Sequence, residues 1–288
     1  MRLAALAGLD GDAGQLGTLA MWWAGARGCC PAPQPERVRV LLLVEPSGGQ
    51  HSEAEPPYAG GAGAVALAAA GASAAGIEVA AGELDPVHQG RRLADAEADA
   101  GTDLLVLGTA AARPAVERAA ATLVAALLGR EPVEVAGSQL REGRFDDARW
   151  AAEVVAVRDG LRTIRQQASG LDPTAVLHAL GAPALGMLAG VIAQAAARRT
   201  PMLLDGVTAC AAALLAARWE PGTTAWLLAA SRPTSPAGVL ALDATDTEAV
   251  LELGMRLDGA AAALCVVPLL RTAVELLVAP TGSGEGVR

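Results

Sequence analysis

One stretch, residues 184–217, constrains the fold of this chain more than any other. A segment rich in alanine, glycine and leucine is followed by three apolar residues at 202–204, then by Asp205 and Gly206, and then by a second alanine-rich segment. The outer segments are long enough for helices, and the three residues between them suit a short buried strand. In open parallel sheets, ligands bind beside the carboxyl ends of the strands. The stretch therefore predicts a helix–strand–helix unit with a carboxylate and a glycine at the ligand-binding edge.

The rest of the chain repeats this alternation. Short apolar runs predict strands at residues 38–44, 77–80, 103–107, 133–135, 202–204 and 225–228. Longer segments predict helices at residues 12–27, 63–75, 91–100, 115–128, 245–253 and 260–278. A further long helix is predicted to begin after Asp146 or Asp147, which can cap it, and to reach Gln167. Strands that alternate with helices indicate an α/β fold, here a Rossmann-like parallel sheet of five or six strands flanked by helices.

Composition excludes several classes of function. Apolar residues make up 52% of the chain and charged residues only 18%, which is typical of a folded protein with a large core. The net charge is −9 with no basic block, and this argues against nucleic-acid binding. All 22 basic residues are arginine, so neither a lysine Schiff base nor a P-loop lysine is available.

The sequence favours a cytoplasmic protein that does not bind a membrane. The uncharged residues 59–77 are mostly alanine and glycine, which suits a packed helix better than a membrane span. The apolar start of the chain is interrupted by Asp10 and Asp12, so it makes a poor signal peptide. None of the four cysteines belongs to a C-x-x-C pair, and we expect them to be reduced thiols that pack in the fold: Cys29, Cys30, Cys210 and Cys265. No cofactor or metal is predicted, because the histidines lack metal-ligand spacing: His51, His88 and His178.

Three segments along the chain carry a resemblance to a known family. Residues 12–25 read DAGQLGTLAMWWAG, residues 253–257 read LGMRL, and residues 284–287 read GEGV. Together with residues 184–217 they resemble the nicotinate-nucleotide:dimethylbenzimidazole phosphoribosyltransferases, which activate the lower ligand of cobalamin. The resemblance implies one phosphoribosyltransferase-like unit over residues 1–288 that forms homodimers. Its α/β core would span residues 37–242, and residues 1–30 and 243–288 would form a small helical lobe.

The resemblance also implies a reaction. In this family a benzimidazole nitrogen attacks the ribose anomeric carbon of nicotinate mononucleotide, nicotinate leaves, and α-ribazole phosphate forms. A glutamate accepts the imidazole proton, and backbone amides hold the phosphate. The expected partners of this chain are therefore nicotinate mononucleotide and a benzimidazole-like base.

The segment that resembles the family's catalytic loop departs from its pattern. The family pattern L-G-E-G-x-G-A-A-L reads LDGAAAAL at residues 257–264, which is one residue shorter. If a gap is placed after Leu257, Asp258 aligns with the glutamate of the family pattern. Asp258 is therefore the candidate general base. The alternative is that Asp258 caps the helix that starts near Ala260.

Two further motifs are also altered. The family pattern G-E-M-G-I-G-N-T-T corresponds to residues 108–114, GTAAARP, where Gly108 remains and Thr109 replaces the acidic residue. The pattern A-S-H-x-S-x-E-P-G-H corresponds to residues 230–239, ASRPTSPAGV, where Ser231 remains and Arg232 replaces a histidine. These four residues are predicted to bind substrate, with Arg232 either contacting an anion or facing solvent.

Asp205 and Gly206 complete the predicted substrate-binding set. One interpretation is that Asp205 faces a ligand and Gly206 lets the ligand approach the backbone, another is that Asp205 caps the helix that begins at Val207, and the two are compatible. Two functions remain open at this point. One is the phosphoribosyl transfer that the resemblance implies. The other is a catalytically degenerate relative that binds a nucleotide or base, or that dimerises with an active partner.

Overall fold

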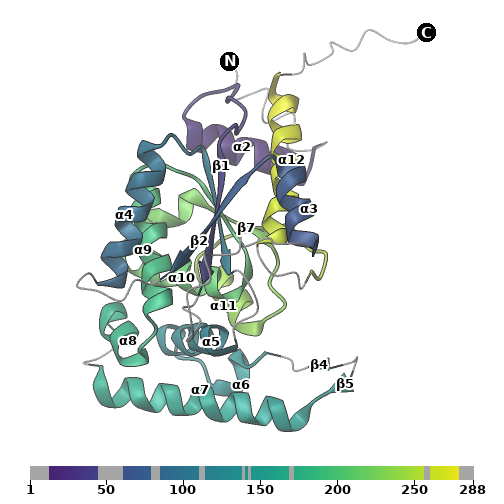
Figure 1. Ribbon diagram of the computed structural model, residues 1–288. Coiled ribbons are helices and arrows are strands. Elements are labelled where there is room, and N and C mark those ends of the chain that lie inside the picture. Colours follow the sequence, from purple (N-terminus) through teal and green to yellow (C-terminus); the bar gives the residue numbers. More distant parts are fainter. Residues whose placement is uncertain are drawn as a thin grey trace.

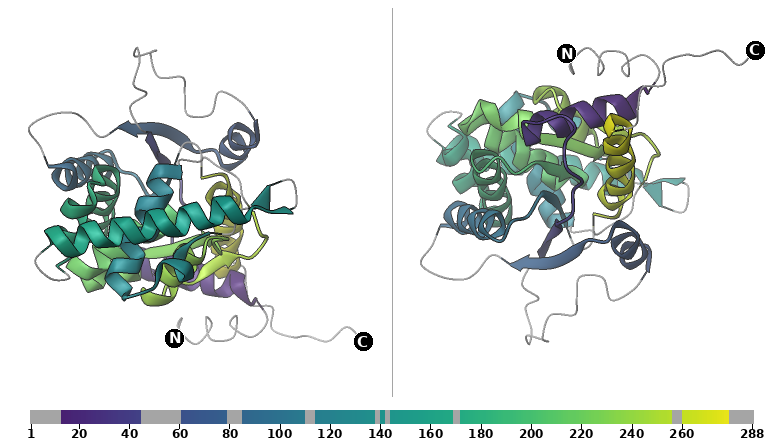
Figure 2. Two further views of the ribbon diagram at one scale, coloured as in Figure 1. Left: turned by 90° about the horizontal axis from the view of Figure 1, so that it is seen from below. Right: turned by 90° about the horizontal axis from the view of Figure 1, so that it is seen from above.

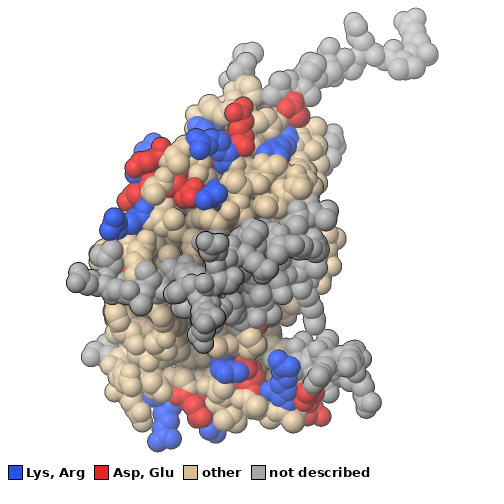
Figure 3. All heavy atoms as spheres, viewed as in Figure 1, with Lys and Arg blue, Asp and Glu red and all other residues tan. Residues whose placement is uncertain are grey.

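One parallel sheet lies between two layers of helices, which is an α/β arrangement (Figure 1). The computed structural model describes residues 13–44, 61–78, 85–109, 114–137, 140–141, 144–168, 172–255 and 260–278. Within these residues, no helix is both long and apolar enough to cross a membrane. On the face seen in Figure 3, arginine and acidic side chains are intermixed and form no large patch of one sign.

The sheet has six strands, and every neighbouring pair is parallel. Their order across the sheet is β2-β1-β3-β6-β7-β8. The bounds are β1 Val38–Val44, β2 Ser73–Glu78, β3 Leu104–Thr109, β6 Met202–Leu204, β7 Leu227–Ser231 and β8 Ala249–Leu251. The predicted α/β class and the predicted parallel sheet of five or six strands are thus confirmed. The chain passes from β1 to β2 on one side and then to β3 on the other, which places a topological switch point between β1 and β3.

The strands are apolar throughout because both faces of the sheet are covered. Alternate residues of β3 illustrate this: Leu105 and Leu107 belong to one core cluster, whereas Leu104 and Val106 belong to the other. The same alternation divides Leu41 and Leu43 from Val40 and Leu42 in β1, and Leu227 and Ala229 from Leu228 and Ala230 in β7. Each strand side chain therefore packs against only one helical layer.

The larger layer contains most of the helices. It includes α4 Pro86–Asp99, α5 Pro114–Leu128, α9 Pro183–Ala197, α10 Gly206–Trp219 and α11 Pro236–Ala244, all of which contribute buried residues to its core. Outside them lie α6 Pro132–Val135, α7 Asp147–Gln167 and α8 Pro173–Leu180, and the long helix α7 packs across α5 (Figure 2). A short hairpin, β4 Leu140–Arg141 and β5 Arg144–Phe145, precedes α7, and the 3-10 helix η1 Pro221–Trp226 precedes β7. Asp146 caps α7 as predicted, because its carboxylate accepts a hydrogen bond of 3.0 Å from the Arg149 N–H.

The smaller layer brings together segments from the two ends of the chain. It consists of α2 Gln15–Arg27, α3 Gly61–Ala70 and α12 Ala261–Val278, with α2 and α12 in contact (Figure 2). Trp23 is fully buried between them and the sheet, and its indole N–H donates a 2.8 Å hydrogen bond to the Pro33 carbonyl. The division into a core and a separate helical lobe stays a prediction. What the packing establishes is that α2 and α12 share an apolar core with the sheet.

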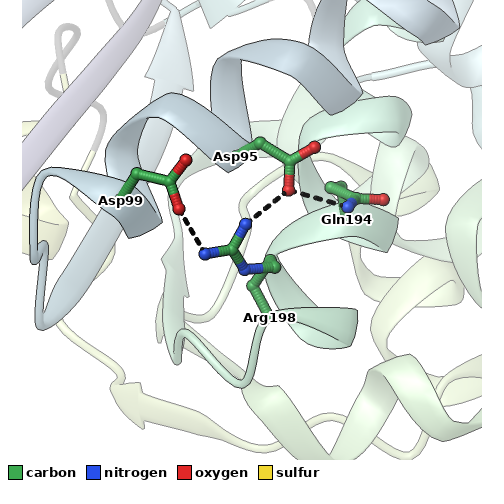
Figure 4. Close-up of polar contacts among 4 residues, drawn as sticks. All are labelled: Asp95, Asp99, Gln194 and Arg198. Atoms are coloured by element: carbon green, nitrogen blue, oxygen red, sulfur yellow. Dashed lines mark hydrogen bonds and ion pairs between the residues drawn. The ribbon is translucent and has the colours of Figure 1, made fainter.

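Helices α4 and α9 make the most extensive helix–helix contact among the described residues. Glycines allow this close approach: a Cβ added at Gly190 would overlap the backbone of Val87, and one at Gly90 would overlap the backbone of Met187. At the carboxyl ends of the two helices, the Arg198 guanidinium lies 3.0 Å from Asp95 and 2.5 Å from Asp99 (Figure 4). The Gln194 amide also donates to Asp95, at 2.8 Å.

Two predicted elements are wrong. Residues 133–135 form part of helix α6 and not a strand, because Pro132 occupies the first turn and the Glu131 N–H donates to the Glu134 carboxylate at 2.8 Å. These local capping interactions outweigh the β-branched side chains. No helix spans residues 245–253 as predicted; residues 249–251 within this range form the edge strand β8, which pairs with β7. The helix in this part of the chain is α11, which lies earlier in the sequence.

Candidate active site

The six residues predicted to bind substrate lie at one edge of the sheet, where the parallel strands end. Leu107, Leu204 and Ala229 are register partners across β3, β6 and β7, so the residues that follow them are neighbours. The Asp205 N–H donates a 2.9 Å hydrogen bond to the Leu107 carbonyl, and the Arg232 N–H donates one of 2.8 Å to Leu251. Gly108, Thr109, Asp205, Gly206, Ser231 and Arg232 are therefore held along this carboxyl edge by the strand backbones.

The alternation of the strands separates these residues by face. Gly108 and Asp205 continue the alternate positions of Val106 and Leu203, which pack against the α12 layer. Ser231 continues the series of Leu227 and Ala229 toward the opposite layer. The edge thus presents one set of groups to the start of α12 and another to the side of α10 and α11.

The start of α12 lies directly against the sheet edge. A Cβ added at Gly108 would lie 3.1 Å from the Ala260 Cβ, so the glycine is what permits this contact. The Ala263 N–H donates a 3.2 Å hydrogen bond to Asp205 Oδ2. Sequence reasoning missed both partners, since a backbone amide and an alanine carry no recognisable side-chain signal. Asp258, the candidate base, lies outside the described residues, two positions before Ala260.

Asp205 does not cap its own helix. It occupies the N-cap position of α10, yet its side chain makes no capping hydrogen bond there, and it bonds to α12 instead. The capping alternative for Asp205 is therefore wrong. Gly206 has φ +83 with no atom within 4 Å of an added Cβ, so a glycine is required here for the turn of the backbone. Burial, and next the charge of Asp205, raise the pKa of the Cys210 thiol in α10 to about 12.

Ser231 is a buried polar group that has no hydrogen-bond partner among the described residues. Its side chain is 7% exposed, and its hydroxyl oxygen has no hydrogen-bond partner within the described part of the chain. An unsatisfied buried hydroxyl costs about 1–3 kcal/mol, so such groups are uncommon in folded proteins. At a ligand-binding edge, a bound molecule would offset this cost.

Arg232 lies in surroundings that disfavour an anion. Its guanidinium is 3.9 Å from the Glu252 carboxylate, and about half of its side chain is exposed. It lines an open hollow together with four acidic residues: Asp243, Asp246, Glu248 and Glu252. Their combined negative charge opposes the approach of a phosphate to this arginine.

Comparisons with known proteins agree over nearly the whole chain. A family model described as phosphoribosyltransferase matches residues 80–281. The nicotinate-nucleotide–dimethylbenzimidazole phosphoribosyltransferase of Mycobacterium leprae is 36% identical over 318 residues, which cover 96% of this chain and 89% of that protein. The enzyme of the same name from Mycolicibacterium paratuberculosis is 37% identical over 314 residues, 93% of this chain and 87% of that protein.

A solved structure shows the same fold. The crystal structure of CobT from Thermus thermophilus superposes with a TM-score of 0.77 at 24% identity, covering 96% of this chain and 94% of that one. The family resemblance read from the sequence is thus confirmed by both sequence and fold. The chain belongs to the nicotinate-nucleotide–dimethylbenzimidazole phosphoribosyltransferase family.

Proposed function

We propose that this protein transfers the phosphoribosyl group of nicotinate mononucleotide to dimethylbenzimidazole or a similar base, a step in building the lower ligand of cobalamin. The observation that carries the proposal is the 36% identity to an enzyme of that name over 96% of the chain. Relatedness over nearly the whole chain supports the same reaction class at the same edge of the sheet.

The chemistry requires one bond to form as another breaks. A ring nitrogen of the base attacks C1′ of the ribose, and the bond from C1′ to the nicotinate nitrogen breaks. Nicotinate leaves, and the proton on the second imidazole nitrogen passes to a general base. The product is the α-ribazole phosphate. The protein must therefore provide a proton acceptor within about 3 Å of the imidazole and donors for the phosphate.

Asp258 is the residue that we assign as the general base. The assignment rests on its place in the sequence, directly before the glycine and alanines that lead into α12. An aspartate is one methylene shorter than the family's glutamate, so the loop must bring it closer to the substrate. Gly108, Thr109, Gly206 and Ser231 are the substrate-binding residues of the proposal, and the buried Ser231 hydroxyl supports its part in it.

The test is an assay of purified protein with nicotinate mononucleotide and dimethylbenzimidazole. Release of nicotinate and formation of α-ribazole phosphate are followed by chromatography with mass detection. We expect product only when both substrates are present, loss of turnover in Asp258→Ala, and retained turnover in Asp258→Glu. Asp99→Ala is the matched control, because Asp99 is an exposed residue at the end of α4. Full turnover in Asp258→Ala would remove Asp258 from the mechanism.

A second function has support from the altered motifs. Residues 108–114 lack the acidic residue and the two later glycines of the family pattern, and Arg232 lies beside carboxylates. These observations favour a protein that binds a nucleotide or base without turning it over. Absence of product with a panel of benzimidazoles, together with a rise in melting temperature on adding nicotinate mononucleotide, would establish binding in place of catalysis.

Two further parts of the proposal concern the state of the protein in the cell. We infer a homodimer and a cytoplasmic location, both from the family resemblance. The mass in solution, measured by light scattering, tests the first. A monomer at concentrations where the enzyme is active would contradict it.

A further inference from the structure

Among the described residues, the first side chain of helix α12 cannot cap it. Ala260 occupies the N-cap position, since its carbonyl accepts the first helical hydrogen bond, from the Leu264 N–H at 3.0 Å. The first N–H groups of any helix lack partners within the helix, and alanine offers no side-chain acceptor for them. Ala260 also has φ +57, in the left-handed region that alanine rarely adopts. Within the described part of the chain, an acceptor for these N–H groups therefore has to come from another element of the fold.

Asp205 supplies the missing acceptor from the end of β6. Its Oδ2 accepts the hydrogen bond of the Ala263 N–H, in the first turn of α12 and 58 residues further along the chain. The carboxylate also carries negative charge at the helix N-terminus, where charge of that sign is favourable. The position of Asp205 is itself fixed, because its backbone N–H bonds to Leu107 and the turn at Gly206 directs the chain away into α10.

Gly108 provides a second contact between the sheet edge and α12. The Cβ that glycine lacks would lie 3.4 Å from both Ala260 Cα and Ala260 N, in addition to the close approach to its methyl group. The strands β3 and β6 thus hold the same turn of α12 at two points. One contact is a charged hydrogen bond and the other is direct packing.

We propose that Asp205 is a positioning residue: by accepting a hydrogen bond in the first turn of α12, it fixes the start of this helix, Ala260 included, against the carboxyl edge of the sheet. This inference rests on the proposed function, in which the base is Asp258, two residues before Ala260. A misplacement of about 1 Å in such a group can reduce the rate about 100-fold. Asp205 acts through α12 and is not itself assigned to the substrate.

Two variants of Asp205 separate positioning from substrate contact. Asp205→Asn keeps an oxygen that can accept the Ala263 hydrogen bond and removes the charge, whereas Asp205→Ala removes both. We expect kcat to fall about 10- to 100-fold in Asp205→Ala, with KM within about threefold of the wild type. In Asp205→Asn we expect most of kcat to be retained.

Asp172→Ala is the matched control. Asp172 caps α8 by accepting a 2.8 Å hydrogen bond from the Ala175 N–H, so this variant loses the same kind of bond away from the predicted site. We expect its kcat and KM to equal those of the wild type. A decrease in kcat as large as that of Asp205→Ala would show that loss of a helix cap anywhere is enough, and would overturn the positioning role.

Hydrogen exchange provides a readout that does not require turnover. The amide of Ala263 should exchange faster in Asp205→Ala and near the wild-type rate in Asp205→Asn. Unchanged exchange in Asp205→Ala, an Asn variant as impaired as the Ala variant, or an effect mainly on KM would each overturn the proposal. Absence of turnover in the wild type would instead refute the proposed function, and the exchange rates would then decide alone whether Asp205 caps α12.

Discussion

The contact between α4 and α9 yields the sharpest test of the packing. Gly190 lies in α9 where the helix meets Val87, and a Cβ added there would lie 3.0 Å from the Val87 carbonyl carbon and 3.1 Å from its Cα, overlapping the oxygen. The obstacle is backbone, so no side-chain rotation can remove it. Gly190→Ala must therefore push the two helices apart by on the order of 1 Å, since carbon–oxygen contacts seldom fall below about 3.3 Å.

The expected cost follows from two opposing effects. Overpacking of this kind costs about 1–3 kcal/mol, and a rigid obstacle favours the upper end. Alanine recovers up to about 1 kcal/mol because it is a better helix former than glycine. We expect Gly190→Ala to lower the free energy of unfolding by about 2 kcal/mol, or Tm by about 4 °C for a chain of this length.

The measurement is urea unfolding followed by circular dichroism, with Gly25→Ala as the control. Gly25 lies in α2, is exposed, and has nothing within 4 Å of an added Cβ. The same substitution there should stabilise the protein by about 0.5 kcal/mol. The two variants thus carry an identical chemical change with opposite expected signs.

A double variant tests whether the two glycines act on one contact. Gly90→Ala alone should also destabilise, because its Cβ would lie 2.8 Å from Val191 N. Once the helices have separated to admit one methyl group, the second costs less, so the combined loss should be smaller than the sum. A Gly190→Ala protein as stable as the wild type would refute the close approach of α4 and α9.

Three further predictions concern single groups. Gly206→Ala should lower the free energy of unfolding by about 1–2 kcal/mol because the residue has φ +83, and Gly206→Asn should lower it by less, as measured by urea unfolding. Equal stability of the wild type and both variants would contradict this. Burial, and next the charge of Asp205, raise the pKa of Cys210 from 9.0 to about 12. The protonated thiol therefore contributes fully to the stability of the fold below pH 9, and this contribution is lost as the pH rises toward 12. Between about pH 8 and about pH 10.5, the wild type should lose about 2 kcal/mol more than Cys210→Ala, and equal losses would show that the thiol ionises normally in the folded state. The hydrogen bonds that Arg198 donates to Asp99 and then to Asp95 raise the pKa of its guanidinium. Because the group is exposed, Arg198→Ala should lower Tm only slightly, and by an amount that disappears in about 1 M salt. A large loss of Tm that resists salt would indicate a role beyond this ion pair.

The sequence predicted the central strands well because of where they lie. β1 and β3 are buried on both faces, so they are continuous apolar runs that stand out from the helices around them. The edge strand β8 has only one neighbour and a mixed composition, and its pattern was mistaken for a helix. The strand predicted at residues 133–135 was wrong because two glutamates and a proline, not the valines, determine the local structure.

The site was predictable only in part, for a physical reason. The position of Asp205 at the carboxyl edge follows from its place directly after a buried strand. Its hydrogen bond to Ala263 does not, because every residue except proline carries an amide and nothing in the local sequence singles this one out. Contacts between a side chain and a distant backbone emerge only once the topology has brought α12 beside β6.

The division of each strand between two helical layers has a consequence for how this protein can change. A substitution at Leu105 changes the packing against one helical layer, and a substitution at Val106 changes the packing against the other. The two cores can therefore accept substitutions almost independently of each other. Insertion of a single residue into β3 would instead affect both helical layers at once. It would exchange the two sets of side chains beyond that point, turn residues shaped for α12 toward α5 and α10, and move Gly108 away from Ala260. Length in the central strands should therefore be far less variable than side-chain identity.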